Sequence, residues 1–223
     1  MTKISVIIPT FNEAGGIEHT LQSLQALRQQ GHEIIVADGG STDKTITLAM
    51  PLADHAIHAS KGRARQMNEG AQQADGEILL FLHADTILPE NAAELISSAL
   101  ASKSWGRFNV RLSGPQRPLR VVEFMMNWRS HLSGIATGDQ AIFIRRKLFQ
   151  QIGGYADIPL MEDIDISKRL KADSKPACIT QPLITSSRRW EQYGIFNTIL
   201  LMWRLRLAYF LGVNPEQLVK HYQ

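Results

Sequence analysis

Short apolar runs alternate with stretches of helical periodicity along the first half of the chain. The apolar runs are rich in β-branched residues, and four of them have the length of buried strands: residues 3–9, 33–38, 55–59 and 76–85. Helical patterns follow them over 16–31, 41–52, 62–74 and 88–101. Such alternation with short connections predicts βαβ units. We therefore expect an α/β fold with a Rossmann-like, mostly parallel, twisted sheet flanked by helices.

Helix starts and the second half of the chain complete the expected order of elements. Ser41 or Thr42 is expected to cap the helix over 41–52, and Pro89 to lie near the start of the helix over 88–101. The second half is less regular, with strands predicted at 105–112 and 139–146 and helices over 117–132 and from Glu162. No linker, repeat or low-complexity tract interrupts the 223 residues, so we expect a single domain over 1–223.

The stretch 195–213 is the segment that most resembles a membrane span. Arg204 and Arg206 interrupt it and lie about 200° apart on a helical wheel, so charges occupy two of its faces. An arginine at the centre of a bilayer costs about 2.5 kcal/mol or more, which argues against a span. We expect packed C-terminal helices, with docking of this segment on a membrane surface as the alternative.

Composition narrows the classes of partner and compartment. The net charge of +3 and the pI near 9.1 suit an anionic ligand but are too small to indicate nucleic-acid binding. Cys178 is the only cysteine, which excludes an internal disulfide and argues against a cysteine-based zinc site. The N-terminal residues contain no long apolar stretch before Pro9. We expect a cytoplasmic protein, with a peripheral position at the inner face of a membrane as the alternative.

Three polar loops follow predicted strands: PTFNE (9–13), DGGSTD (38–43) and HADT (83–86). The carboxyl ends of parallel strands meet at one edge of the sheet, and ligands of such sheets bind there. Asp38 could accept hydrogen bonds from a ribose or a base, while the two glycines after it let a ligand approach the backbone. The alternative is that Asp38 and Asp43 only cap a turn and a helix.

The tripeptide HAD ends the fourth predicted strand. Asp85 offers a carboxylate to a divalent cation, and Mg²⁺ or Mn²⁺ often takes one or two protein carboxylates together with substrate phosphates. His83 could bind Mn²⁺ or contact a nucleotide, but for metal binding we favour the alternative of a packed histidine.

A pair of carboxylates, Glu162 and Asp163, begins the helix EDIDISKRL. One member of such a pair can deprotonate an acceptor hydroxyl as a general base. The alternative is that these acids stabilise the helix dipole. Asp165 lies roughly 200° from Asp163 on the helical wheel, so the two side chains are expected to have different functions.

Two cationic groups complete the set of candidates. Arg188, Arg189 and Trp190 combine guanidinium groups, which suit phosphate oxygens, with an indole that can form a pocket wall. Residues 61–65 bring together Lys61, Arg63 and Arg65 after the third predicted strand. For both groups the alternative is a solvated basic surface.

The segments SVIIPTFNE, VADGGSTDKT, GRARQMNEGAQQADGEILLFLHADT, TGDQAIFIRR and MEDIDISKRL, taken in order, resemble family-2 glycosyltransferases with the nucleotide-diphospho-sugar (GT-A) fold. The resemblance covers nearly the whole chain. It implies that residues 1–104 bind a nucleotide sugar and that 105–223, with the C-terminal helices, bind the acceptor. LFLHADT, TGDQ, EDI and SRRW further resemble a subgroup of short, single-domain bacterial members that have been linked to arsenosugar biosynthesis.

The same resemblance implies residue roles. The nucleotide sugar would be contacted by Pro9, Thr10, Glu13, Asp38, Ser41, Lys61, Arg63, His83 and Asp85. HAD stands where the family has an Asp-X-Asp motif, so Asp85 would bind Mn²⁺ or Mg²⁺, while His83 replaces the first aspartate. Asp163, beside Glu162, would be the base. The diphosphate or the acceptor would be contacted by Gly138, Asp139, Arg188, Arg189 and Trp190, in a variant of a Gln-X-X-Arg-Trp motif that lacks its Gln and has Ser187 before the arginines.

The activity implied is metal-dependent, inverting transfer of a sugar from a nucleoside-diphosphate sugar to an unidentified small-molecule or lipid-linked acceptor. A homodimer is compatible with the sequence. The first alternative is a non-catalytic sugar-nucleotide binder, against which the intact Glu162–Asp163 pair argues. The second is a nucleotidyltransferase, but PTFNEAGGIE lacks the basic residue expected in its first loop.

Overall fold

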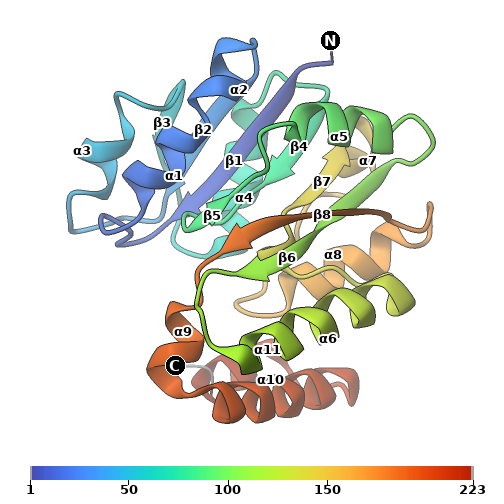
Figure 1. Ribbon diagram of the computed structural model, residues 1–223. Coiled ribbons are helices and arrows are strands. Elements are labelled where there is room, and N and C mark those ends of the chain that lie inside the picture. Colours follow the sequence, from blue (N-terminus) through green and yellow to red (C-terminus); the bar gives the residue numbers. More distant parts are fainter. Residues whose placement is uncertain (1, 222–223) are drawn as a thin grey trace.

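The computed structural model describes residues 2–221, whose strands form one eight-stranded sheet with helices on both faces (Figure 1). The strands are β1 (Ile4–Thr10), β2 (Glu33–Asp38), β3 (His55–His58), β4 (Ile78–Phe81), β5 (Thr86–Ile87), β6 (Trp105–Leu112), β7 (Ile142–Arg145) and β8 (Ala177–Thr185). Their order is β3-β2-β1-β4-β7-β6-β8-β5. The first four strands run parallel, as do β6 and β8, whereas β7 and β5 run antiparallel to their neighbours. The predicted α/β fold with a mostly parallel sheet is confirmed.

Both faces of the sheet are buried under helices. The helices are α1 (Ile17–Ser23), α2 (Gln25–Gln29), α3 (Thr45–Ala49), α4 (Arg63–Gln73), α5 (Ala92–Ala99), α6 (Arg117–Ser133), α7 (Arg146–Gln151), α8 (Glu162–Leu170), α9 (Arg188–Tyr193), α10 (Ile195–Phe210) and α11 (Pro215–Leu218), with 3-10 turns η1 (Gly138–Gln140) and η2 (Val219–His221). Val6 and Ile8 of β1 share a core cluster with α1, α5 and α6. Ile7 points to the other face and shares a cluster with α4, α7 and α8. This explains why β1 is apolar at successive positions rather than alternating.

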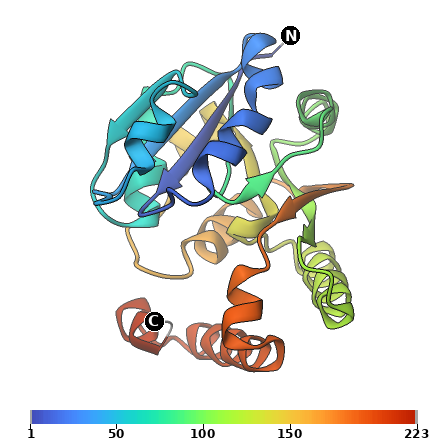
Figure 2. The ribbon, with the colours of Figure 1, turned by 60° about the vertical axis from the view of Figure 1, so that its left-hand side comes forward.

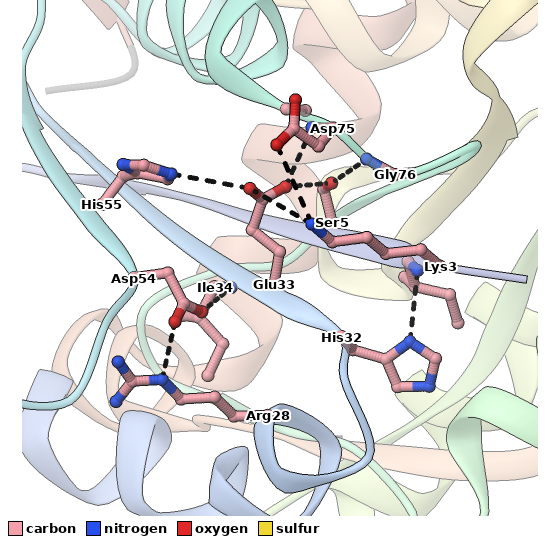
Figure 3. Close-up of polar contacts among 12 residues, drawn as sticks. Lys3, Ser5, Arg28, His32, Glu33, Ile34, Asp54, His55, Asp75 and Gly76 are labelled. Carbon is pink, nitrogen blue, oxygen red and sulfur yellow. Dashed lines mark hydrogen bonds and ion pairs between the residues drawn. The ribbon is translucent and has the colours of Figure 1, made fainter.

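A buried carboxylate ties the strands together at their amino ends (Figure 3). Glu33 accepts hydrogen bonds from the Ser5 hydroxyl at 2.5 Å and from the Asp75 backbone N–H at 3.0 Å. Lys3 and His55 lie 3.8 and 3.6 Å from the same carboxylate. This network joins β1, β2, β3 and the turn before β4, at the sheet edge opposite the predicted ligand site.

Several predicted boundaries are wrong. The helix expected over 16–31 is divided at Leu24 into α1 and α2. The helix expected from Ser41 or Thr42 begins only at Thr45, because the Ser41 hydroxyl bonds to Asp38 and so holds a turn instead of capping a helix. The predicted strands over 76–85 and 139–146 are shorter, at 78–81 and 142–145, and α5 begins at 92, beyond Pro89.

The C-terminal region consists of strand β8 followed by α9, α10 and α11, which lie below the sheet in the views of Figures 1 and 2. β8 was not predicted from the sequence, although it fills the place between β6 and β5. The predicted packed C-terminal helix is correct for one face only. Leu205 of α10 packs with Leu160, Ile164 and Leu218. The opposite face leaves five large apolar side chains exposed: Phe196, Leu200, Trp203, Leu207 and Phe210. Within residues 2–221, no helix combines the length and apolar character needed to cross a bilayer.

Candidate active site

A cavity of about 950 Å³ opens at the carboxyl ends of β1 and β4, the sheet edge at which the sequence predicts ligand binding. The loop after β1 contributes Glu13 to its wall, and the loop after β4 contributes His83 and Asp85. The turn η1 and the start of α8 form the next part of the wall, and α6, α9 and α10 complete it. The cavity therefore lies between the first half of the sheet and the later helices.

The paired carboxylates begin α8 inside this cavity. Met161 precedes them with φ 70°, a left-handed conformation that costs a side-chain-bearing residue about 1–3 kcal/mol. The Asp163 carboxylate accepts hydrogen bonds from the backbone N–H of Gly138 at 3.1 Å and of Ile164 at 2.7 Å. Both of its oxygens are thus held in place by backbone donors, and neither bond uses a positively charged partner.

Glu162 differs sharply from its neighbour. Its side chain is only 5% exposed, and the Arg63 guanidinium lies 3.4 Å from its carboxylate. Burial raises the pKa of Glu162, and the charge of Asp163 adds to the effect, while Arg63 opposes it. Two adjacent carboxylates therefore occupy different environments, which is how paired acids acquire separate functions.

His83 is packed rather than free. Its Nδ1 lies 3.3 Å from the Asp139 carboxylate, and its Nε2 is buried without a hydrogen-bond partner among the described residues. A Cβ added to Gly138 would lie 2.4 Å from that Nε2, so a glycine is needed where the ring meets η1. Burial raises the pKa of Asp139, but the hydrogen bond and charge of His83 outweigh it and leave the pKa lowered. The imidazole is therefore packed against η1, while its relation to a metal or nucleotide stays a prediction.

Hydrogen bonds connect the loop after β1 to the loop after β2. The Asp38 carboxylate is fully buried and accepts from the Thr10 hydroxyl, from the Ser41 hydroxyl and from the N–H groups of Gly40 and Ser41. All four hydrogen bonds that this carboxylate makes within residues 2–221 hold the end of β1 and the turn after β2, as the alternative interpretation of Asp38 requires. A contact with a ribose or base would need one of these bonds to be exchanged, so that role stays a prediction.

Gln66 of α4 completes this connection and was missed from the sequence. Its amide donates to the backbone carbonyls of Thr10 at 2.6 Å and Ala37 at 2.9 Å. Gln66 is buried on a helix whose other face is charged. The sequence offered one signal for this role: Gln66 is a polar residue at a position where the helical period of α4, as at Met67, places buried side chains.

Most predicted site residues come together in the cavity, but four do not line it. Pro9, Glu13, Arg63, His83, Asp85, Gly138, Asp139, Glu162, Asp163, Arg188, Arg189 and Trp190 all line it. Thr10, Asp38 and Ser41 do not line it and are joined to one another by hydrogen bonds at the ends of β1 and β2. The Lys61 ammonium instead lies 4.2 Å from the centre of the Phe11 ring, where a cation is attracted to the ring face.

The basic residues of α9 contact both halves of the molecule. Arg188 donates to the Glu13 carboxylate at 3.3 Å, which links α9 to the loop after β1. The Arg189 guanidinium lies 5.8 Å from the centre of the Tyr193 ring. Trp190 is partly buried against the main core cluster and lines the cavity with its remaining surface.

Two arginines that the sequence did not assign to the site lie in the same cavity. Arg129 of α6 and Arg206 of α10 both line it. Nε and Nη2 of Arg129 and Nε of Arg206 are buried without a hydrogen-bond partner among the described residues. Burial, together with the positive charge of Arg206, lowers the pKa of Arg129 to about 10. Arg206 was noted only as an interruption of an apolar segment, and that interruption was the signal.

The donor set suits a divalent cation held mainly by a ligand. Residues 2–221 contain no cluster of three or more histidine, cysteine, aspartate or glutamate side chains able to enclose a metal. Asp85 nevertheless presents a carboxylate to the cavity. Mg²⁺ and Mn²⁺ are commonly held by one or two carboxylates and substrate phosphates, so these residues fit such an ion.

Comparison with known proteins assigns this arrangement to a family of enzymes. Residues 5–149 match the family model for glycosyl transferase family 2. The chain is 31% identical over 189 residues to an uncharacterised glycosyltransferase of Mycobacterium tuberculosis, covering 79% of this chain and 71% of the relative. It is 29% identical over 235 residues to a PGL/p-HBAD biosynthesis glycosyltransferase of Mycobacterium bovis, covering 94% of this chain and 86% of the relative.

Solved structures share the fold. Residues 1–349 of S. aureus TarS superimpose with a TM-score of 0.65 at 18% identity, covering 83% of this chain and 60% of TarS 1–349. A mannosyltransferase from Pyrobaculum calidifontis, in complex with GDP-Man and Mn²⁺, gives a TM-score of 0.62 at 22% identity, covering 93% of this chain and 61% of that protein. The chain thus spans about three fifths of these two proteins, and the similarity confirms a GT-A-like architecture.

Proposed function

Because this chain belongs to glycosyltransferase family 2 and is a glycosyltransferase, we propose that it moves a sugar from a nucleoside-diphosphate sugar to an acceptor hydroxyl, with Asp163 as the base. The observation that carries the proposal is the Asp163 carboxylate, fixed inside the cavity by the N–H groups of Gly138 and Ile164. Solved proteins of the same fold hold UDP-GlcNAc, or GDP-Man with Mn²⁺. Those ligands define the donor class to be tested here.

The reaction is a displacement at the anomeric carbon. The acceptor oxygen forms a bond to that carbon as the bond from the carbon to the diphosphate oxygen breaks, and the acceptor proton passes to Asp163. Attack from the face opposite the leaving group inverts the configuration. The nucleoside diphosphate leaves with the bonding electron pair, and Arg188 and Arg189 face the cavity where this charge grows.

Asp85 would hold the divalent cation, which supplies charge neutralisation on the diphosphate when it is bound. His83 would orient Asp139 and support η1, because its imidazole lies between Asp139 and Gly138. Glu162, paired with Arg63, would hold the start of α8 next to the reacting atoms. The narrower resemblance to the bacterial subgroup linked to arsenosugar biosynthesis stays a prediction.

Calorimetry with UDP- and GDP-sugars, with and without Mn²⁺, followed by an assay of donor hydrolysis, tests this function. Asp163→Asn should lower turnover by a factor of about 10²–10⁴ and leave donor binding intact. Asp165→Asn is the matched control, because Asp165 lies on the same helix but pairs with Arg169. Near-normal turnover of Asp163→Asn would show that the base is another residue. Donor binding without turnover in the wild type would indicate a non-catalytic binder.

The same calorimetry tests whether Asp85 binds the metal ion. Asp85→Asn should abolish the gain in donor affinity that Mn²⁺ produces and leave metal-free binding unchanged. An unchanged Mn²⁺ effect would exclude Asp85 as the ligand.

A further inference from the structure

Helix α10 exposes a stripe of large apolar side chains. Phe196, Leu200, Trp203, Leu207 and Phe210 are 59–79% exposed. At about 100° per residue, their spacing places them within an arc of about 80° on the helix. Scattered exposed apolar residues are ordinary, whereas a continuous stripe of this size marks an interaction surface.

Helix α6 exposes a second stripe. Val121, Phe124, Trp128 and Leu132 are 51–65% exposed and follow the same helical spacing. α6 and α10 lie at the lower end of the molecule, away from the strand β3 edge of the sheet (Figures 1 and 2). We call the two stripes together the docking face.

The docking face is continuous with the candidate active site. Val121 and Trp128 of α6 and Phe196 and Trp203 of α10 belong to the docking face and also line the cavity. The same cavity contains Asp163. A molecule lying against the docking face therefore borders the same cavity as the proposed base.

The charge around the docking face is positive. Within 117–133 and 188–210 the chain has seven arginines, two glutamates and no lysine or aspartate: Arg117, Arg120, Arg129, Arg188, Arg189, Arg204 and Arg206 against Glu123 and Glu191. Arg120 pairs with Glu123 and Arg188 pairs with Glu13, so counting Glu13 as a third acid leaves an excess of four positive charges. Exposed apolar stripes flanked by cationic side chains complement the interface of a bilayer that contains anionic lipids.

Two of these arginines lie where a polar headgroup would enter. Arg129 and Arg206 line the cavity, and three of their guanidinium nitrogens are buried without a hydrogen-bond partner among the described residues. Unpaired buried donors of this kind are costly unless a ligand supplies acceptors. An anionic group on the acceptor would satisfy them while its hydroxyl faces Asp163.

We propose that the docking face lies on an anionic bilayer and that the acceptor is an anionic amphiphile of that bilayer, with its headgroup between Arg129 and Arg206. The acceptor assignment rests on the proposed glycosyl transfer, whereas the docking does not. A bilayer fits better than a second copy of this chain, because a symmetric dimer would place like-charged arginines opposite one another. The aromatic side chains of the two stripes also suit the membrane–water interface.

Sedimentation with vesicles tests the docking. The wild type should bind vesicles of equal parts phosphatidylcholine and phosphatidylglycerol more tightly than phosphatidylcholine alone. The variant Leu200→Glu/Leu207→Glu/Phe210→Glu alters exposed residues that do not line the cavity. A charge at the surface of an anionic bilayer is worth about 1 kcal/mol, a factor of about five, so three charges should weaken binding about a hundredfold. Donor binding without vesicles should be unchanged.

Met50→Glu is the control, because Met50 is equally exposed, at 65%, but is remote from the cavity. It should bind vesicles like the wild type. The proposal is overturned if the wild type does not bind vesicles or if the triple variant binds them equally well. A wild-type dimer that the triple variant dissociates, without vesicle binding, would instead assign the docking face to a second copy.

The acceptor class is tested with vesicles made from the total lipid of the source organism and a labelled nucleotide sugar that calorimetry shows to bind. The label should reach the organic phase with the wild type and not with Asp163→Asn. If the label is found only as free sugar or in a water-soluble product while vesicle binding is intact, the assignment of an amphiphile as the acceptor is wrong. Failure of donor binding would overturn the proposed function and leave the docking result standing.

Discussion

Replacing Gly138 with alanine tests whether the packing of His83 against η1 positions the proposed base. The glycine is needed because an added Cβ would lie 2.4 Å from His83 Nε2 and 2.8 Å from Cε1. The N–H of the same residue donates to the Asp163 carboxylate at 3.1 Å. The clash is relieved by a movement of the His83 ring or of η1, and a movement of η1 displaces a group that holds Asp163.

The size of the shift follows from the contact distances. Ordinary contact begins at 3.4 Å, so a contact of 2.4 Å must lengthen by 1.0 Å. A misplacement of about 1 Å in a reacting group costs about a hundredfold in rate, and overpacking a well-packed site costs about 1–3 kcal/mol of stability. If η1 takes up the whole shift, Gly138→Ala lowers turnover about a hundredfold while the protein remains folded, and a smaller loss measures the part that His83 takes up.

A double-mutant cycle with His83→Ala gives the decisive measurement of turnover. Removing the imidazole removes the clash, so Gly138→Ala should have a much smaller effect in the His83→Ala background. Gly16→Ala is the control, since a Cβ there meets only the Ala84 carbonyl oxygen at an ordinary 3.8 Å. An equal loss from Gly138→Ala in both backgrounds would refute the argument that His83 transmits the effect.

Two further predictions concern stability. Gln66→Leu removes the donor shared by two buried backbone carbonyls and should cost about 1–3 kcal/mol per carbonyl in urea unfolding, whereas Gln72→Leu, on the exposed side of α4, should cost about 0.5 kcal/mol or less. Burial raises the pKa of Glu162 above 4.5, so its folded form retains a proton that the unfolded form loses. The wild type should therefore lose stability relative to Glu162→Gln as the pH rises from 4.5 through the folded-state pKa, and a difference in Tm that stays constant with pH would contradict this.

The sequence predicts the first half of the fold well because each of its strands is a compact apolar run. β1 and β2 are buried on both faces, so their residues are apolar at successive positions and their ends are marked by Thr10 and Asp38. β8 was missed for the opposite reason. Its pattern is mixed, with exposed residues from Thr180 to Pro182, and a bulge in its pairing with β6 breaks the alternation.

Site residues were predictable from the sequence where they are neighbours in one motif, and were not predictable where they depend on contacts between distant segments. Glu162 and Asp163 were identifiable because two acids at a helix start are conspicuous in the sequence. The contact of His83 with Gly138 depends on how η1 crosses the end of β4, and no local pattern encodes it. Arg129 was likewise hidden, since an arginine on an amphipathic helix is normally solvated. Two of the charged groups near it, Arg206 of α10 and Asp163 of α8, are far from it in the sequence.

Helix α6 shows that the helical spacing of apolar residues does not by itself predict which of them are buried. In α6, Leu119, Val122 and Met126 pack into the main core, while Phe124 and Trp128 are exposed on another face. Both sets follow helical spacing, so the sequence could indicate an apolar helix but not which face meets the sheet.

The strained backbone conformations lie close to the candidate active site. Asn12, Ala141 and Met161 are the non-glycine residues with positive φ among the described residues, and they lie in the loop after β1, directly after η1 and directly before α8. Each such conformation costs about 1–3 kcal/mol and persists only where surrounding contacts determine it. Since neither alanine nor methionine favours this conformation, local sequence opposes the geometry that presents Asp163. The site is therefore held by tertiary contacts, such as those of Gly138 and Gln66, rather than by the loops themselves.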